Sequence, residues 1–449
     1  MISKIEKYIV FWIFLVMLCY TARINWSHGQ WERVIQSDGK GYYAYLPAVF
    51  IYHDLNFGFF QETEVNKSYD KSLFYDYRSN HGGKVIDKYF IGESILLAPF
   101  FLTAHLGAGI TQSPADGYSR LYVVFLTIAA LFYLALGLYF FQKTLRLYSF
   151  RPGTIVLTLM ALLFGTNLFY YSIGEVAMSH VYSFSMVSVF IYQLRRYFNT
   201  LNLVNLVFAS IALGLIILIR PVNGLVVFSV PFLAGTPGAF IRGIRNLKEG
   251  RLLVFLSVLC FLAIVSIHLI VYKFQTGDFF VYSYGSEGFD FLHPHVMDFL
   301  FSYKKGFFIY TPLCLIALLG LIPAYTRKFE FFAILFFLML VVYSLSCWWM
   351  WYYGGSFSAR VMVEYLPFFG ILLAGLVNWA VRKKIRMLVS GLIALSIMVN
   401  QVQTIQYRYY MIHWSEMNRQ KYWDTFLNIK PVIEKKWNQD IPARDTGRK

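Results

Sequence analysis

Charged residues are scarce in this chain: Asp, Glu, Lys and Arg together make up 14% of its 449 residues. A water-soluble domain carries nearer to a quarter, so this shortage excludes an ordinary soluble protein. Instead, 58% of the residues are hydrophobic and 20% are aromatic. This composition is typical of a protein embedded in a membrane. Aromatic residues at this level suit lipid interfaces and sugar-binding surfaces equally well.

Cysteine is also rare, and all four cysteines lie within or at the ends of apolar runs: Cys19, Cys260, Cys314 and Cys347. Since none lies in a long loop, we expect no disulfide framework and no structural zinc site. The chain has no basic, aromatic-rich soluble module, so its net charge of +16 does not indicate a nucleic-acid partner. That charge lies mostly in short loops, where it sets topology and can contact anionic lipid headgroups.

Long apolar runs organise the chain. The first, Tyr8–Tyr20, follows two lysines and has no small-residue cleavage site after it, which indicates an uncleaved signal-anchor helix. A second run covers Ser94–Ile110. The others are Tyr118–Phe141, Thr154–Ile173, Ala177–Leu194, Leu203–Ile219, Val222–Ala234, Leu252–Tyr272, Phe307–Ala324, Phe329–Trp349, Tyr365–Val381 and Met387–Val402. Several are shorter than the roughly 20 residues of a straight span, so we expect tilted or paired helices.

Basic residues mark the loops that we expect on the cytoplasmic side. They are Lys143, Arg146, Arg151, Arg195, Arg196, Arg242, Arg245, Lys248, Arg251, Arg327, Lys328, Arg382, Lys383, Lys384 and Arg386, with Lys4 and Lys7 at the N-terminus. Since the first span leads outward, an odd number of crossings must then lie between residues 27 and 142. We expect Ser94–Ile110 not to cross, because Glu93 flanks it and it contains His105 and two glycines. The total is about eleven spans with the C-terminus outside; twelve spans with a cytoplasmic turn at Thr111–Gly117 is the alternative.

This topology predicts an all-α polytopic protein of a bacterial-type inner (cell) membrane, with a transmembrane domain at 1–403 and a short polar exterior tail at 404–449. The first exterior segment, 26–92, is too long for a turn and too aromatic for a disordered linker. We expect it to fold against the membrane and to carry juxtamembrane helices. The tail is long enough for two or three short helices over the outer face.

The leading candidate for chemistry is Asp38, within Ser37-Asp38-Gly39 of the first exterior segment. A carboxylate just outside a membrane span, on a glycine-containing turn, can deprotonate or orient an acceptor during glycosyl transfer. No second acid is adjacent, so there is no Asp-x-Asp pair to chelate a divalent metal. We therefore expect no metal cofactor. The simpler alternative is an Asp-Gly turn beside an interfacial aromatic belt.

Four exterior cations are candidates for binding a phosphate. Lys88 lies next to the membrane surface, and Arg360 ends a dense run of aromatic residues and glycines that begins at Trp348. Lys305 opens a span on the outer side against the charge trend, which suggests an anionic partner. Arg220 lies in a Pro-containing break of an apolar region and could face the same pocket. Each could instead anchor a helix end or extend to the interface.

Further residues are expected to wall this pocket or support it: Tyr42, Tyr43, Glu93, Glu175, His180, Trp351, Gly354 and Gly355. The two glycines let the backbone approach a ligand. Glu175 and His180 flank a short exterior turn, where ionisable groups are costly unless they are used or paired. A helix-capping pair is the alternative there. The His-Pro-His spacing at His293 and His295 is too tight for a confident metal site.

Taken together, these motifs resemble the integral-membrane glycosyltransferases of the GT-C superfamily, which includes protein O-mannosyltransferases and the bacterial aminoarabinose transferases that act on lipid A. The resemblance covers most of residues 1–380 and depends on the order and spacing of the set. Its carriers are Ser37-Asp38-Gly39, Asp87-Lys88-Tyr89, Arg220-Pro221-Val222-Asn223, Gly288-Phe289 and Pro294 ahead of Lys305-Gly306-Phe307, and the run from Gly354 to Arg360.

The resemblance implies a GT-C-like helical bundle and an inverting transfer on the extracytoplasmic face. The donor would be a sugar on a polyprenyl phosphate, and the acceptor a lipid, a glycan or a protein. Asp38 matches the first-loop catalytic acid, and Lys88 matches a basic residue that meets the lipid phosphate. Many members pair two acids in this region, so a second acid would be Asp54, Asp87 or Glu93.

Two other functions stay open at this point. A flippase or transporter for lipid-linked glycans should carry paired charges deep within its spans and show repeat symmetry, whereas the apolar runs here are nearly free of charge. An O-antigen-type ligase or polymerase uses similar donors, but it relies on a large, arginine-rich late exterior loop. That loop holds few arginines in this chain.

Overall fold

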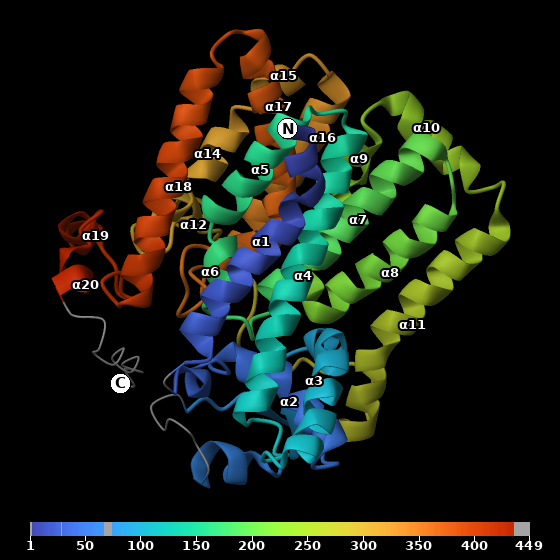
Figure 1. The fold of residues 1–449 in the computed structure, drawn as a ribbon. Coiled ribbons are helices and arrows are strands. Elements are labelled where there is room, and N and C mark those ends of the chain that lie inside the picture. Colours follow the sequence, from blue (N-terminus) through green and yellow to red (C-terminus); the bar gives the residue numbers. More distant parts are fainter. Residues whose placement is uncertain (1, 28, 67–73, 435–449) are drawn as a thin grey trace.

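The computed structural model describes residues 2–27, 29–66 and 74–434, and these ranges form a helical bundle with one small hairpin (Figure 1). By length and composition, six of its helices can cross a membrane, or seven if the bent pair Pro221–Ala234 and Pro237–Asn246 counts as one span. The expected all-α polytopic architecture therefore agrees with the structure apart from the hairpin. The number of eleven spans is not confirmed.

The helices in chain order are α1 (Ile2–Asn25), α2 (Asp38–Phe50), α3 (Gly92–Thr111), α4 (Arg120–Leu147), α5 (Pro152–Phe164), α6 (Leu168–Ile173), α7 (His180–Thr200), α8 (Val204–Ile219), α9 (Val230–Ala234), α10 (Pro237–Asn246), α11 (Arg251–Thr276), α12 (Val296–Phe301), α13 (Phe307–Tyr310), α14 (Pro312–Leu318), α15 (Leu321–Ala324), α16 (Lys328–Ser346), α17 (Leu366–Arg382), α18 (Arg386–Arg408), α19 (Arg419–Thr425) and α20 (Lys430–Glu434). Tighter or wider turns form the 3-10 helices η1 (Gln30–Arg33), η4 (Pro221–Ser229) and η5 (Arg360–Tyr365) and the π-helix η2 (Gln61–Asn66). The strands are β1 (Arg78–His81) and β2 (Lys84–Asp87).

Several predicted spans are broken into shorter helices. The run Phe307–Ala324 becomes α13, α14 and α15, since Pro312 cannot donate a backbone hydrogen bond within a continuous helix. The run Val222–Ala234 begins as η4 and continues as α9. These breaks explain why few helices reach the length of a straight span, although the apolar runs are numerous.

The basic loops gather at one end of the bundle. At this end, Glu6 of α1 accepts a hydrogen bond at 2.8 Å from Arg146 near the end of α4. The Arg195 guanidinium lies 4.3 Å from the centre of the Tyr148 ring. This contact joins the basic segment near the end of α4 to the one near the end of α7. The N-terminus, α10 and α15 lie at this end in Figure 1. A single basic end is what a cytoplasmic face requires.

Helix α3 lies along only the first half of α4. The Tyr133 hydroxyl donates to the Leu96 carbonyl at 2.8 Å, and the Tyr122 hydroxyl contacts His105 at 2.6 Å. Both ends of α3 therefore lie on the half of α4 that is away from the basic loops. By length and composition α3 is one of the six possible spans. That it does not cross stays a prediction, and this placement supports it.

The first exterior segment folds into a second small core against the bundle. Buried aromatic residues of α2, the hairpin and the loops between them form this core: Tyr42, Tyr45, Phe57, Phe59, Phe60, Tyr77 and Tyr89. The Gln275 amide of α11 donates to the Leu55 carbonyl at 2.6 Å and fixes the segment to the bundle. This segment contains the helix α2, and its position beside the membrane stays a prediction. The segment departs from helix at the hairpin, in which β1 and β2 pair antiparallel with Arg78 opposite Asp87.

The C-terminal tail is not a separate unit. The predicted boundary at 403/404 falls inside α18, which continues to Arg408. The Gln403 amide donates to the Tyr422 hydroxyl of α19 at 3.0 Å, and the Tyr422 ring packs edge-on against Tyr310 of α13. Two short helices, α19 and α20, follow as expected. Residues 435–449 of the predicted tail lie outside the described residues.

Candidate functional site

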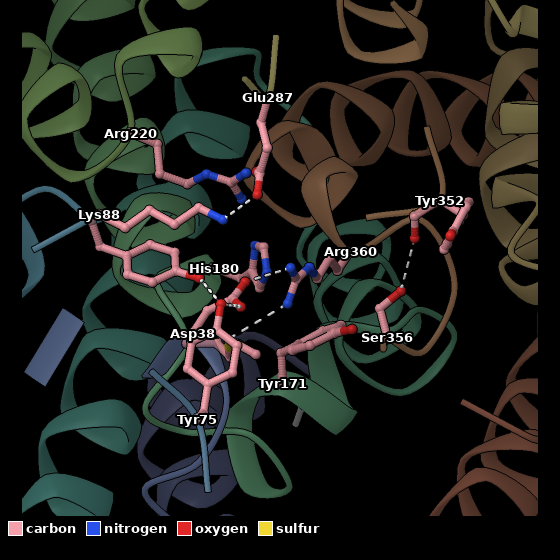
Figure 2. A network of polar contacts seen from close by, with 12 residues as sticks. Asp38, Tyr75, Lys88, Tyr171, His180, Arg220, Glu287, Tyr352, Ser356 and Arg360 are labelled. Carbon is pink, nitrogen blue, oxygen red and sulfur yellow. Dashed lines mark hydrogen bonds and ion pairs between the residues drawn. The ribbon is translucent and has the colours of Figure 1, made fainter. Parts of the chain in front are cut away.

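A cavity of about 720 Å³ lies where the first exterior segment meets the loops that follow α8, α11 and α16. Four predicted site residues line it: Asp38, Lys88, Arg220 and Arg360. They come from four distant parts of the sequence, and Figure 2 shows their side chains directed toward one another. Tyr42, Gly354 and Gly355 also line the cavity, as predicted.

Close packing of α2 places Asp38 at the cavity wall. A Cβ atom on Gly39 would lie 2.7 Å from the Ala177 carbonyl oxygen, and one on Gly41 would collide with the Tyr89 ring. The glycines therefore let α2 pack against the loop between α6 and α7 and against Tyr89 of the first segment. They do not form the flexible turn that we predicted. Ser37 precedes the helix with φ 51° and ψ −139°, a conformation that is costly for a residue with a side chain.

The Asp38 carboxylate is held from two sides. Its Oδ2 accepts a hydrogen bond from Arg360 Nη2 at 2.5 Å, and its Oδ1 accepts one from the Tyr75 hydroxyl at 3.3 Å. Burial by itself would raise the pKa of this carboxyl. The positive charge of Arg360 opposes burial most strongly, followed by a hydrogen bond from Tyr89, and the net result is a pKa below the usual value. Asp38 is therefore an anion at neutral pH.

Arg360 has a different immediate partner from the one we predicted. Its guanidinium is paired with Asp38, and its Nη1 also lies 3.7 Å from Met178 Sδ. A guanidinium bound to a carboxylate holds that carboxylate in place and keeps it ionised. Its distance to a donor phosphate is not defined by this structure, so the predicted phosphate contact stays a prediction.

Lys88 lies opposite Asp38 and pairs with an acid that the sequence did not single out. Its Nζ donates to Glu287 Oε1 at 2.6 Å and lies 5.2 Å from the centre of the Tyr284 ring. The side chains of Lys88 and Glu287 are 21% and 28% exposed, so both reach the cavity. The Ser283 hydroxyl donates to the Lys88 carbonyl at 2.7 Å and fixes this loop against the first segment.

None of the three predicted second acids lines the cavity. Asp54 accepts hydrogen bonds from the amides of Asn56 and Gly58 and so stabilises its own loop. Asp87 accepts from the Tyr89 amide at 2.8 Å, and burial raises the pKa of this carboxyl well above its usual value. Glu93 is fully buried within α3. The second cavity acid is instead Glu287, which lies 199 residues beyond Lys88 in the chain.

Arg220 reaches the cavity from the break between α8 and η4. Its Nη1 donates to Glu364 Oε1 at 3.4 Å, and the same oxygen accepts from His180 Nδ1 at 3.0 Å. His180 is thus part of the support behind the cavity, and it is not in the wall itself. Glu364 was missed by the sequence analysis. The cluster of His180, Arg220 and Glu364 lies where α7, α8 and η5 meet. The expectation that the apolar runs are nearly free of paired charges is therefore incomplete.

Besides His180, five residues that we predicted for the site lie away from the cavity wall: Tyr43, Glu93, Glu175, Lys305 and Trp351. The Tyr43 hydroxyl donates to the Gly117 carbonyl at 2.5 Å, and Glu175 accepts from the Tyr170 hydroxyl at 3.2 Å. Lys305 is buried and donates to the Ser356 carbonyl. Trp351 stacks over His295. The predicted site roles of these five residues stay predictions.

Aromatic residues form much of the rest of the cavity wall. Trp348 and Trp349 line the cavity in place of Trp351, together with Phe289 and Tyr284 of the loop after α11. Trp414 joins them from the tail, which the sequence analysis left outside the site. A Cβ atom on Gly355 would lie 2.9 Å from the Trp414 ring, so glycine permits this contact. Such a wall can stack on the apolar face of a sugar ring.

In the described part of the chain, no three His, Cys, Asp or Glu side chains are grouped so that they could hold a metal ion. Independence from a divalent metal stays a prediction, since the charges of the donor itself contribute to such sites.

Comparison with known proteins does not assign a family. No family model and no curated protein matches the chain. Among solved structures, the chain is similar to the crystal structure of the oligosaccharyltransferase of Archaeoglobus fulgidus, with 13% sequence identity and a TM-score of 0.46. The match covers 99% of this chain and 61% of the archaeal chain, which is considerably longer. A likeness of this size does not establish a shared activity.

Proposed function

We propose that this protein is an integral-membrane glycosyltransferase that moves a sugar from a polyprenyl-phosphate donor to an acceptor on the extracytoplasmic face. The observation that carries the proposal is the Asp38 carboxylate, which is held by Arg360 at 2.5 Å in a cavity that Lys88 and Arg220 also line. An anionic carboxylate facing two cations fits a reaction that removes a proton from one partner and releases a phosphate from the other.

The proposed reaction is a single displacement. Asp38 accepts the proton of an acceptor hydroxyl or amine while the acceptor atom attacks the anomeric carbon of the donor. The bond from that carbon to the phosphate oxygen breaks, and its electron pair stays on the departing polyprenyl phosphate. Lys88 and Arg220 stabilise the charge of this leaving group. Attack from the side opposite the phosphate inverts the anomeric configuration.

The arrangement of charges supports an extracytoplasmic site in a bacterial-type inner membrane. The basic loops lie at one end of the bundle, as shown by the Glu6–Arg146 pair, and α2 and α3 lie toward the other end (Figure 1). By the positive-inside rule, the basic end faces the cytoplasm and the cavity faces outward. A polyprenyl donor can reach such a cavity from the outer leaflet.

The experiment is Asp38→Asn in membranes supplied with extracted lipid-linked sugars. We expect the transfer rate to fall by at least about 100-fold, because a general base contributes this much or more. Asp298→Asn is the matched control, since Asp298 is an exposed exterior acid that pairs with His295 at 3.3 Å. Undiminished transfer by Asp38→Asn would refute the catalytic role. Movement of the donor across the membrane without a new glycoside would indicate a flippase instead.

A further inference from the structure

Two charged side chains of helix η5 contact two different parts of the site. Arg360, its first residue, reaches Asp38 of α2, and Glu364 reaches the junction of α7 and α8. The two residues are four positions apart in a 3-10 helix. With three residues per turn, their side chains point roughly 120° apart. One short helix therefore touches both the proposed base and a cation of the cavity wall.

Glu364 is fully buried, with no exposure of its side chain. A single oxygen, Oε1, accepts from His180 Nδ1 at 3.0 Å and from Arg220 Nη1 at 3.4 Å. Within the described ranges, Oε2 has no hydrogen-bond partner. A buried carboxylate requires a counter-charge, and Arg220 provides it. The pair is thus held by charge as well as by a hydrogen bond.

Arg220 depends on this contact for its position at the cavity. It lies at the helix break before Pro221 with an extended backbone, φ −151° and ψ 111°, and its side chain is 16% exposed. An arginine side chain loses rotamer entropy when it is held in one orientation, and the ion pair with Glu364 offsets this loss. Figure 2 shows Arg220 extending toward the region of Lys88 and Glu287, where a donor phosphate would be bound.

We propose that Glu364 is a positioning residue for donor binding, which holds the Arg220 guanidinium against the cavity wall while Arg360 of the same helix holds Asp38. The inference depends on the proposed function, because it takes Arg220 as a ligand of the donor phosphate. Glu364 is not in the cavity wall, so it acts through Arg220 and does not touch the donor.

The test is Glu364→Gln in the full-length protein, assayed for sugar transfer from lipid-linked donors. We expect the apparent KM for the donor to rise roughly 10-fold, as for the loss of one charge-assisted hydrogen bond, with kcat changed less than about 2-fold. Because both changes remove the same interaction, the double variant E364Q/R220Q should match R220Q alone. Additive losses in the double variant would overturn the inference.

Glu330→Gln is the matched control. Glu330 is also a buried glutamate paired with an arginine, since Arg327 donates to it at 2.8 Å, but it lies at the basic end of the bundle. We expect an unchanged donor KM for E330Q. An equal rise in both variants would show a general effect of a lost buried charge and would refute a positioning role for Glu364.

A binding measurement separates this inference from the proposed function. Farnesyl phosphate should raise the Tm of the purified protein more than farnesol does, and E364Q should reduce this phosphate-specific shift while E330Q preserves it. A full shift in E364Q would overturn the inference. Glu364-dependent phosphate binding without any glycosyl transfer would refute the proposed function alone. If E364Q does not fold, E364D keeps the charge, shortens the reach and is expected to change donor KM in the same direction.

Discussion

The Glu287 carboxylate pairs with the Lys88 ammonium group, which a donor phosphate would also need. Lys88 Nζ lies 2.6 Å from Glu287 Oε1, and the Tyr282 hydroxyl donates to the Glu287 carbonyl, so the loop is held in this position. The charges in the cavity and behind it are balanced in pairs: Asp38 with Arg360, Glu364 with Arg220, and Glu287 with Lys88. A phosphate that binds Lys88 therefore competes with the Glu287 carboxylate for the same positive charge, and the two anions repel each other. We predict that Glu287→Gln strengthens donor binding.

The size of the effect follows from the exposure of the pair. The two side chains are 21% and 28% exposed, so solvent screens their attraction substantially. An ion pair of this kind contributes about 1 kcal/mol, near the upper end for pairs in contact with water. Removing a competitor of that strength lowers the apparent donor KM about 5-fold. Without the acid, Lys88 also attracts anions more strongly, so the donor KM should rise more steeply with salt concentration.

The assay is initial-rate transfer at varied donor and salt concentration in detergent or liposomes. Asp290→Asn is the control, because Asp290 is an acid of the same exterior loop that pairs with His293 at 2.9 Å. We expect D290N to leave the donor KM unchanged. A donor KM in E287Q that equals or exceeds the wild-type value would refute the competition between Glu287 and phosphate for Lys88.

Two further predictions concern Asp38 and Asp87 of the first exterior segment. Arg360 lowers the pKa of Asp38, and a carboxyl with a lowered pKa stays ionised until the pH falls through that value. In Arg360→Gln the acid limb of the pH–rate profile should therefore move to higher pH. An acid limb that does not move would contradict this role of Arg360. Asp87 has the opposite behaviour, because burial raises its pKa and the folded protein binds a proton that the unfolded chain releases. The wild type should therefore lose stability as the pH rises above about 4, the usual Asp value, towards the raised pKa of Asp87, whereas Asp87→Asn should not, so the Tm of D87N relative to the wild type rises over this range. D87N keeps the acceptor for the Tyr89 amide and should change the transfer rate less than about 2-fold. A Tm difference between D87N and the wild type that is constant with pH would show that Asp87 is ionised in the folded protein.

The sequence by itself determined the membrane character, the helical class and four residues of the cavity wall. These properties have one-dimensional signals: apolar runs, basic loops, and polar residues beside exterior ends of spans. Asp38, Lys88, Arg220 and Arg360 were found in this way, and all four line the cavity. Signals of this kind depend on composition and local spacing, which tertiary contacts do not alter.

The tertiary structure alone decided which partner each of these groups has. Asp38 and Arg360 are 322 residues apart, and Lys88 and Glu287 are 199 apart, so no spacing rule relates them. Glu287 and Glu364 were missed because their role comes only from what they touch. Lys305 has the same local signal as Lys88, but its ammonium meets the Ser356 carbonyl. Hydropathy places a charged residue beside the membrane, whereas packing decides whether it faces the cavity or a neighbouring loop.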